Sequence, residues 1–240
     1  MNQGSDASDK GPSENTIEWH AGDMPYSTAF GDHYYSRTDG RAECAHVFVN
    51  GNNLLQRWSK KRRFTIGELG FGTGLNFVET WRQWQAAPGN KGYLHFVSFE
   101  RFPLKAADMA RALDAWPALS ALSDPLVSAW PDQPSQIVRI AFDENVSLEV
   151  HIGDALPCLQ AWSGMADAWF LDGFSPARNS QMWSPELMSE IYQHTNAGGS
   201  FATYSAAGWV RRNLQAAGFI VEKRPGHTGK RDMSIGTRAR

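Results

Sequence analysis

The sequence has little cysteine and no long hydrophobic run. Its two cysteines, Cys44 and Cys158, lie far apart in the chain, which argues against a disulfide framework. No group of cysteines and histidines has the spacing of a zinc site, so no metal is expected. No apolar run is long enough to span a membrane, and the polar N-terminus lacks the apolar core of a signal peptide. These absences predict a cytoplasmic protein.

The size and charge of the chain exclude fewer classes of protein. The 240 residues, 42% of them hydrophobic, fit one α/β domain with additions. The net charge of −2 excludes no partner, but basic residues gather in two segments: 57–63 reads RWSKKRR, and eight basic against two acidic residues follow position 207. The stretch between them, 64–207, holds seven basic and fifteen acidic residues. Basic segments of this kind are typical of a nucleic-acid-binding surface or of a solvated surface with a basic tail.

From residue 64 onward, strand-like and helix-like segments alternate. Strands are expected over 64–72, 93–100, 167–174 and 198–205, with a strand pair joined at 143–145, and helices over 75–85, 103–116, 155–162, 184–195 and 206–218. This alternation predicts a doubly wound α/β fold with a mostly parallel sheet. The last two strands, 219–225 and 231–237, have no helix between them and are expected to form an antiparallel hairpin.

Helix ends and domain limits follow from local signals. Ser184 before Pro185 predicts a helix start, Gly218 a helix end, and Pro103 the first position of its helix. Residues 1–15 are expected to be a disordered leader. Residues 16–63, with strand-like stretches such as CAHVFV (44–49), are expected to form an N-terminal cap on a core domain of 64–240.

The segment GELGFGTGLNF (67–77) predicts a cofactor loop between a strand and a helix. Glycines let a ligand approach the backbone, and the following helix start can hold an anion. The dinucleotide spacing G-x-G-x-x-G fails, because Leu75 and Phe77 occupy the third glycine position in the two possible registers. The spacing therefore favours S-adenosylmethionine over a nicotinamide cofactor, with a turn needed only for packing as the alternative.

Acidic residues stand at the ends of successive predicted strands. Glu68, Glu100, Asp154 and Asp172 should meet at the carboxyl edge of the sheet, where open α/β sheets bind ligands. Asp154 could instead cap a helix. Asp172, in FLDGFSPARNSQMW, is the candidate catalytic residue: it could hold an alkylammonium group and accept its proton before methylation. Phe174 would wall that pocket. Cys158 fits a small core residue better than a nucleophile.

Several motifs together resemble one family. ELGFGTGLNF, LHFVSFERFPL, DAWFLDGFSPARNSQMW, GGSFATYSAAGWVRRNLQAAGF and GKRDM resemble the methyltransferase domain of MnmC, a bifunctional enzyme family that modifies tRNA wobble uridines. The resemblance implies a Rossmann-like class I methyltransferase that uses S-adenosylmethionine to methylate the amine of 5-aminomethyl-2-thiouridine in the tRNA anticodon region. Gly70, Gly72 and Gly74 would then form the cofactor loop with Glu68 nearby, Glu100 would bind the ribose, Asp154 the adenine, and Asp172 would face the amine.

Charge adds candidate phosphate contacts at Lys61, Lys230 and Arg231. Family members continue into a flavin-dependent oxidoreductase domain, whereas this chain stops at Arg240, so that domain is expected to be missing. Two other functions stay open: methylation of a small-molecule amine, and a non-catalytic RNA-binding module. A nicotinamide oxidoreductase is a more distant alternative.

Overall fold

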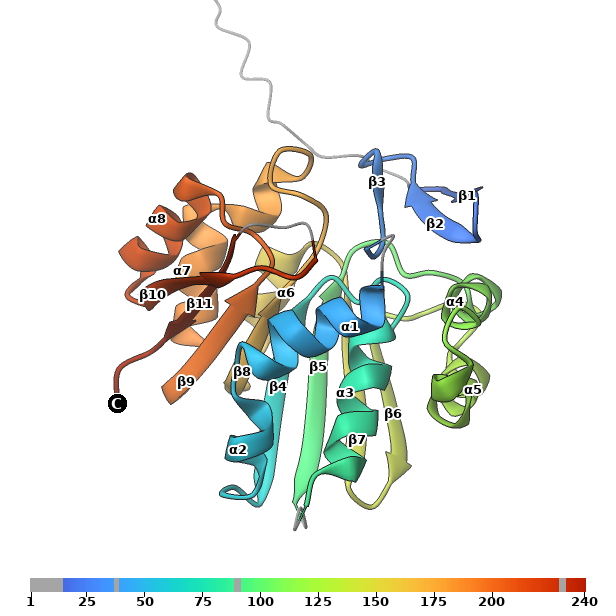
Figure 1. Ribbon diagram of the computed structural model, residues 1–240, viewed down its shortest axis with the longest axis horizontal. Coiled ribbons are helices and arrows are strands. Elements are labelled where there is room, and N and C mark those ends of the chain that lie inside the picture. Colours follow the sequence, from blue (N-terminus) through green and yellow to red (C-terminus); the bar gives the residue numbers. More distant parts are fainter. Residues whose placement is uncertain (1–14, 37–38, 89–91, 229–231) are drawn as a thin grey trace, which may run out of the picture.

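The described part of the chain contains one large sheet of eight strands (Figure 1). The structure is a computed structural model that describes residues 15–36, 39–88, 92–228 and 232–240. In sheet order, the strands are β10 (Ile220–Pro225), β11 (Asp232–Thr237), β9 (Thr195–Thr203), β8 (Ala166–Leu171), β4 (Arg63–Leu69), β5 (Tyr93–Glu100), β7 (Val146–Ile152) and β6 (Ile137–Asp143). The expected leader, apart from Asn15, and the candidates Lys230 and Arg231 lie outside the described residues.

Strand directions confirm the predicted fold class. Strands β9, β8, β4, β5 and β7 run parallel. The final strand β11 pairs antiparallel with both β9 and β10, and β6 pairs antiparallel with β7. The chain order reverses at β4, which has β5 on one side and β8 on the other. Ligands of doubly wound sheets bind at such a reversal.

Helices cover both faces of the sheet and bury two separate apolar clusters. One face carries α1 (Gly40–Cys44), η1 (Ala45–Asn50), α2 (Leu54–Trp58), α3 (Leu75–Ala86), α4 (Ala106–Leu113), η2 (Pro117–Leu119) and α5 (Ser120–Ala129). The other carries α6 (Ala155–Ala161), η3 (Ser180–Trp183), α7 (Pro185–Gln193) and α8 (Gly208–Ala217). Every residue of β8 is buried, which explains its apolar run from Ala168 to Leu171.

The stretch 44–49 is helical, so its prediction as strand-like was wrong. Asp39 accepts a hydrogen bond from the Ala42 N–H at 3.0 Å and starts α1, which continues directly into the π-helical η1. Phe48 of η1 stacks on Phe170 of β8 with 4.9 Å between ring centroids. A short apolar run that packs on a sheet carries no periodicity to separate strand from helix, so tertiary packing decided its state.

The helix expected over 103–116 is shorter than predicted. It begins at Ala106, with Lys105 as its N-cap, and so excludes Pro103 from the first helical position. By contrast, Ser184 caps α7 by accepting from the Leu187 N–H at 3.2 Å, and Gly218 ends α8 with φ of 116°. These two predicted helix boundaries are confirmed.

A second, smaller sheet stands above the carboxyl ends of the parallel strands (Figure 1). It contains β1 (Ile17–His20), β2 (Met24–Ser27) and β3 (Asp32–His33), all antiparallel. Asp32 accepts a hydrogen bond from the Ser175 N–H at 3.2 Å, which joins this sheet to the loop after β8. No helix in the described part of the chain is long and apolar enough to cross a membrane.

Candidate active site

A cavity of about 460 Å³ opens at the carboxyl ends of β4, β5, β7 and β8. It takes its walls from the loops that follow those strands and from the N-terminal segment. Its lining includes the sequence-predicted residues Gly70, Gly72, Glu100, Asp154, Asp172 and Phe174. A second cavity of about 400 Å³ adjoins it and shares His33, Tyr34, Gly70, Gly72, Asp172 and Gly173. Asp172 therefore stands between two spaces.

The three glycines of the loop have different surroundings. Gly70, Gly72 and Gly74 all have positive φ, at 80°, 53° and 80°, which disfavours residues with a Cβ. A Cβ on Gly70 would lie 3.4 Å from Gly173 Cα, and one on Gly72 would lie 3.3 Å from a Tyr34 ring carbon. A Cβ on Gly74 would instead lie 2.9 Å from Leu126. Gly70 and Gly72 thus line the cavity, whereas Gly74 turns the chain into α3 against the core.

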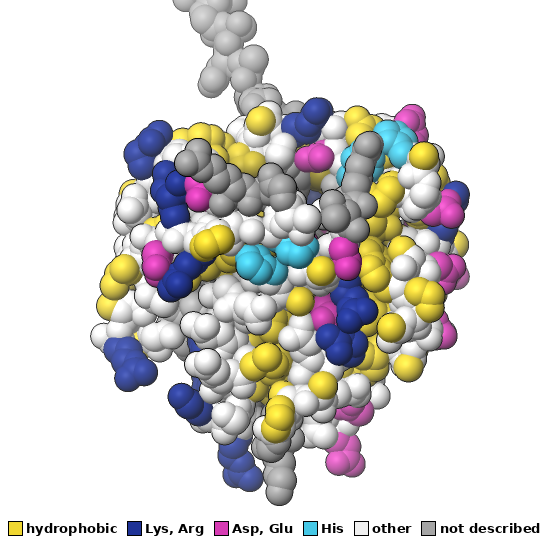
Figure 2. All heavy atoms as spheres, in the orientation of Figure 1, with side chains coloured by type: hydrophobic (Ala, Val, Ile, Leu, Met, Phe, Trp, Pro, Cys, Tyr) yellow, Lys and Arg dark blue, Asp and Glu magenta, His cyan; other side chains and the backbone are white. Residues whose placement is uncertain are grey.

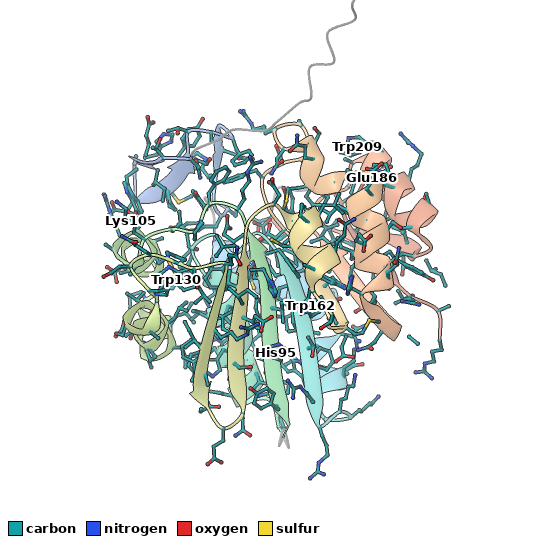
Figure 3. All side chains as sticks on the ribbon, turned by 180° about the vertical axis from the view of Figure 1, so that it is seen from behind. His95, Lys105, Trp130, Trp162, Glu186 and Trp209 are labelled. Carbon is teal, nitrogen blue, oxygen red and sulfur yellow. The ribbon has the colours of Figure 1, made fainter. Side chains whose placement is uncertain are left out.

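An aromatic pair supports the loop from behind. Phe71, between the first two loop glycines, stacks on Trp130 with 5.1 Å between ring centroids and an interplanar angle of 10°. The Trp130 indole N–H donates to the Leu104 carbonyl at 3.0 Å. Trp130 is labelled in Figure 3, where it lies between the sheet and the α4–α5 region. This packing gives the loop a fixed base.

Glu100 ties the loop to the end of β5. Its carboxyl oxygens accept from the Gly72 N–H at 2.9 Å and the Phe102 N–H at 2.7 Å. Burial raises the pKa of Glu100, and the backbone hydrogen bonds oppose that shift. The Glu100 carboxylate also lines the cavity, where hydroxyls of a ligand can approach it.

Asp154 and Arg101 form an ion pair at the rim of the cavity. The Arg101 Nη1 lies 3.0 Å from the Asp154 Oδ1, and the Asp154 side chain is 58% exposed. Both residues line the cavity. Asp154 directly precedes α6 but its side chain makes no hydrogen bond to that helix, so its carboxylate faces the cavity and Arg101.

Glu68 and Asp172 meet through a residue that sequence reasoning missed. The Asn76 amide donates to Asp172 Oδ2 at 2.7 Å and to Glu68 Oε1 at 3.0 Å. Glu68 itself lies behind the cavity, fully buried, and accepts from the Ser98 hydroxyl at 2.8 Å. Burial, and then the charge of Asp172, raise the pKa of Glu68 well above its ordinary value. The position of Asn76, two residues after Gly74, was the available signal.

Aromatic rings form the wall next to Asp172. Phe174 stacks on Phe30 with 4.6 Å between centroids and meets Tyr34 edge-on at 5.2 Å. Tyr34 accepts a hydrogen bond from the Asn15 amide at 2.7 Å, and burial raises its pKa. Phe30, Tyr34 and Asn15 come from the N-terminal segment, and no motif in the sequence marked Asn15.

Lys61 lies at the opposite edge of the sheet from the cavity. Its ammonium group forms an ion pair with Asp167, at the amino end of β8. Asp167 also accepts from the Thr65 N–H at 3.0 Å and from the Asn196 amide at 2.7 Å. The structure therefore does not bring Lys61 together with the other predicted site residues.

Comparison with known proteins identifies the family. A family model described as S-adenosyl-L-methionine-dependent methyltransferase matches residues 117–239, about half of the chain. The chain belongs to this family of methyltransferases, and S-adenosylmethionine is its cofactor. The cavity suits that group, because Gly70 and Gly72 bring bare backbone to it and the Glu100 carboxylate can accept from hydroxyls.

Two curated relatives share the name tRNA 5-methylaminomethyl-2-thiouridine biosynthesis bifunctional protein MnmC. The protein of Chromohalobacter salexigens is 45% identical over 226 residues, which are 92% of this chain and 32% of that protein. That of Methylobacillus flagellatus is 45% identical over 227 residues, 93% of this chain and 35% of that protein. The chain thus spans about a third of the relatives it matches. They confirm the resemblance drawn from its motifs.

A solved structure shares the fold. The crystal structure of MNMC2 from Aquifex aeolicus matches with a TM-score of 0.74 and 24% sequence identity. The match covers 95% of this chain and 72% of that chain.

Proposed function

We propose that this chain methylates the amine of 5-aminomethyl-2-thiouridine at the wobble position of tRNA. The observation that carries the proposal is the place of Asp172, which lines two adjoining cavities at the point where the strand order reverses. One space can hold the methyl donor and the other an amine, with the carboxylate between them. The relatives named MnmC supply the substrate class.

The chain's own residues have separable roles in this proposal. When bound, S-adenosylmethionine supplies a methyl group that is attached to a sulfonium sulfur. After methyl transfer, this sulfur is left as a neutral thioether. Gly70 and Gly72 would offer backbone to it, Glu100 would accept from its ribose hydroxyls, and Asp154 would bind near its adenine. These residues hold the donor in place, which is a large part of catalysis for a displacement reaction.

Asp172 handles the proton. An alkylamine is mostly protonated at neutral pH, and its nitrogen must lose a proton before it can form a bond to carbon. The carboxylate of Asp172 would first pair with the ammonium group and then accept its proton. Phe174, stacked on Phe30, would pack against the uracil ring. The aromatic wall also limits the access of water to the amine.

The same proposal extends to the partner and to the domains. We propose the tRNA anticodon region as the partner, and a flavin-dependent oxidoreductase domain in the part of the longer relatives that this chain does not span. We propose residues 16–63 as a cap and 64–240 as the methyltransferase core, with α1 to α2 packed in the same apolar cluster as α3. A cytoplasmic location agrees with a tRNA substrate.

The test is a labelling experiment. The protein is incubated with radiolabelled S-adenosylmethionine and bulk tRNA from a strain that lacks this methylation, and the tRNA is digested to nucleosides. We expect label in 5-methylaminomethyl-2-thiouridine. Binding of the donor without label in tRNA would contradict the proposal and favour a small amine, whose binding should lack the steep salt dependence of a polyanion.

A further inference from the structure

Three polar side chains from three segments of the chain meet where the two cavities adjoin. They are Glu68 in β4, Asn76 in the first turn of α3 and Asp172 after β8. The Asn76 Nδ2 lies 2.7 Å from Asp172 Oδ2 and 3.0 Å from Glu68 Oε1. An amide nitrogen carries two hydrogens, so both are used to join the two carboxyl groups.

Electrostatics favour a retained proton on one of these two carboxyl groups. Two carboxylates that share a donor at this distance repel each other, and the more buried one is the costlier to charge. Glu68 is fully buried, whereas Asp172 borders both cavities. The Ser98 hydroxyl donates to Glu68 Oε2 at 2.8 Å, and this bond and the one from Asn76 lower the pKa of Glu68 against the larger, opposite effect of burial.

The surrounding titratable groups act in the same direction. The charges of Glu100 and Asp172 both raise the pKa of Glu68. Asp172 raises the pKa of Tyr204 and of Cys44, after burial as the main cause for each. Other charged or titratable groups that line the cavities are Asp32, Glu43, Asp154, His33, Arg101 and Arg178. Arg101 is paired with Asp154, and burial is the largest cause that favours a retained proton on Glu68.

We propose that Asn76 is a positioning residue for Asp172 and is itself held in place by Glu68. The amide fixes the Oδ2 oxygen of Asp172 and hence the plane of the carboxylate that faces the cavities. The neutral Glu68 anchors the amide without repelling the charge on Asp172. The role of Asp172 in taking a proton from an amine rests on the proposed function, but the geometry of the three side chains does not.

The residue that follows Asp172 explains why such an anchor is needed. Gly173 has φ of 113°, and a glycine next to the reacting carboxylate leaves the backbone with more freedom than other residues would. A small displacement of a catalytic group can lower a rate about a hundredfold. The hydrogen bond from the Asn76 amide therefore restrains the Asp172 side chain next to a glycine, whose backbone is less restrained than that of other residues.

The first test replaces Asn76 and uses a matched asparagine as control. Asn196 donates to Asp167 at 2.7 Å at the other end of β8, the same distance as the bond from Asn76 to Asp172. Asn76→Ala is expected to lower kcat for tRNA methylation about a hundredfold, with the dissociation constant for S-adenosylmethionine within about threefold, and Asn196→Ala is expected to leave kcat unchanged. Asn76→Ser, which keeps a donor, should recover part of the loss. Equal effects of Asn76→Ala and Asn196→Ala would overturn the proposal.

The pH profile separates positioning from general loss of structure. Without the hydrogen bond to its charged form, Asp172 should bind a proton more readily, so the acidic limb of kcat against pH should move to higher pH in Asn76→Ala. Glu68→Gln should recover most of the kcat that Glu68→Ala loses, because glutamine resembles the protonated acid. A Glu68→Gln variant as slow as Glu68→Ala would show that Glu68 works as a carboxylate.

A structural readout keeps this test independent of the substrate. In a crystal structure of Asn76→Ala, the Asp172 carboxylate should be rotated or disordered, whereas that of Asn196→Ala should match the wild type. An unchanged Asp172 in Asn76→Ala would overturn the proposal even if the wild type methylated no tRNA. Inactivity of the wild type toward tRNA would contradict only the proposed function.

Discussion

Two aspartates lie at opposite ends of β8, Asp167 near its start and Asp172 just after its end, and they have different hydrogen-bond and ion-pair partners. Asp167, at the amino end of β8, pairs with Lys61 and accepts from the Thr65 N–H and the Asn196 amide. Arg57 adds a bond from its guanidinium to the Asp167 carbonyl at 2.6 Å. A nearly buried carboxylate with these donors is satisfied by the fold itself. Asp167 therefore holds α2 and the start of β4 against β8.

Asp172, at the carboxyl end of β8, accepts from a neutral amide and lies in the field of Glu68. It borders both cavities. Basic side chains are scattered over the face shown in Figure 2, and Lys60 to Arg63, at the start of β4, are exposed. The comparison teaches that a carboxylate is available for chemistry where the fold supplies acids and open space, and is structural where it supplies a cation.

Among the substitutions that test this comparison, Asp172→Ala is expected to have the largest effect. We expect turnover to fall by about 10²–10⁴-fold, the usual contribution of a general acid or base, because the amine would lose the group that takes its proton. Binding of S-adenosylmethionine, measured by calorimetry, should stay within about threefold. Methylation at the wild-type rate would remove Asp172 from the amine site.

Asp167→Ala should give the opposite pattern. Removal of the acceptor leaves the Thr65 N–H and the Asn196 amide without that bond, which typically costs about 1–3 kcal/mol in unfolding free energy. The activity per folded molecule should not change, since Asp167 lies at the far edge of the sheet. Urea unfolding and a methylation assay on the same samples measure both quantities. A loss of kcat without a loss of stability would break the comparison.

Glu68→Gln tests the retained proton through stability. A group whose pKa is raised on folding stabilises the protein fully below its unfolded pKa, and that contribution is lost as pH rises toward the folded pKa. Above about pH 4.5, the ordinary value for Glu68, the wild type should therefore lose unfolding free energy relative to Glu68→Gln, by up to about 1.4 kcal/mol per pH unit. Unfolding at a series of pH values gives the slope. Parallel curves for the two proteins would mean that Glu68 is ionised in the fold.

Lys61→Ala should have the smallest effect. The Lys61 side chain is about half exposed, and ion pairs with exposed partners contribute about 1 kcal/mol or less. The charge pattern predicted a phosphate contact at this residue, whereas its place at the amino edge predicts unchanged tRNA affinity. Binding at several salt concentrations decides the matter, since loss of a phosphate contact would reduce the salt slope by about one. The exposed neighbour Lys60 offers a control substitution.

The sequence by itself determined the sheet, its antiparallel last strand and the residues at its carboxyl edge. Some signals depend only on neighbouring residues, and these predicted strands and helices of the large sheet without knowledge of contacts. They are the strand and helix periods, the helix boundaries at Ser184 and Gly218, and the glycine loop. Gly70, Gly72, Glu100, Asp154, Asp172 and Phe174 were found because the ends of parallel strands meet at one edge. All six line the same cavity.

Only the tertiary structure decided what each polar group meets. CAHVFV became helical because it packs on β8, Glu68 lies behind the cavity instead of in it, and Lys61 is held by a residue 106 positions away. Asn76 joins Glu68 and Asp172 across three elements. Hydrogen bonds and ion pairs between distant segments have no sequence period, and the protonation of a buried acid depends on the neighbours that folding brings to it. The division of labour between Asp167 and Asp172 is therefore a property of the fold.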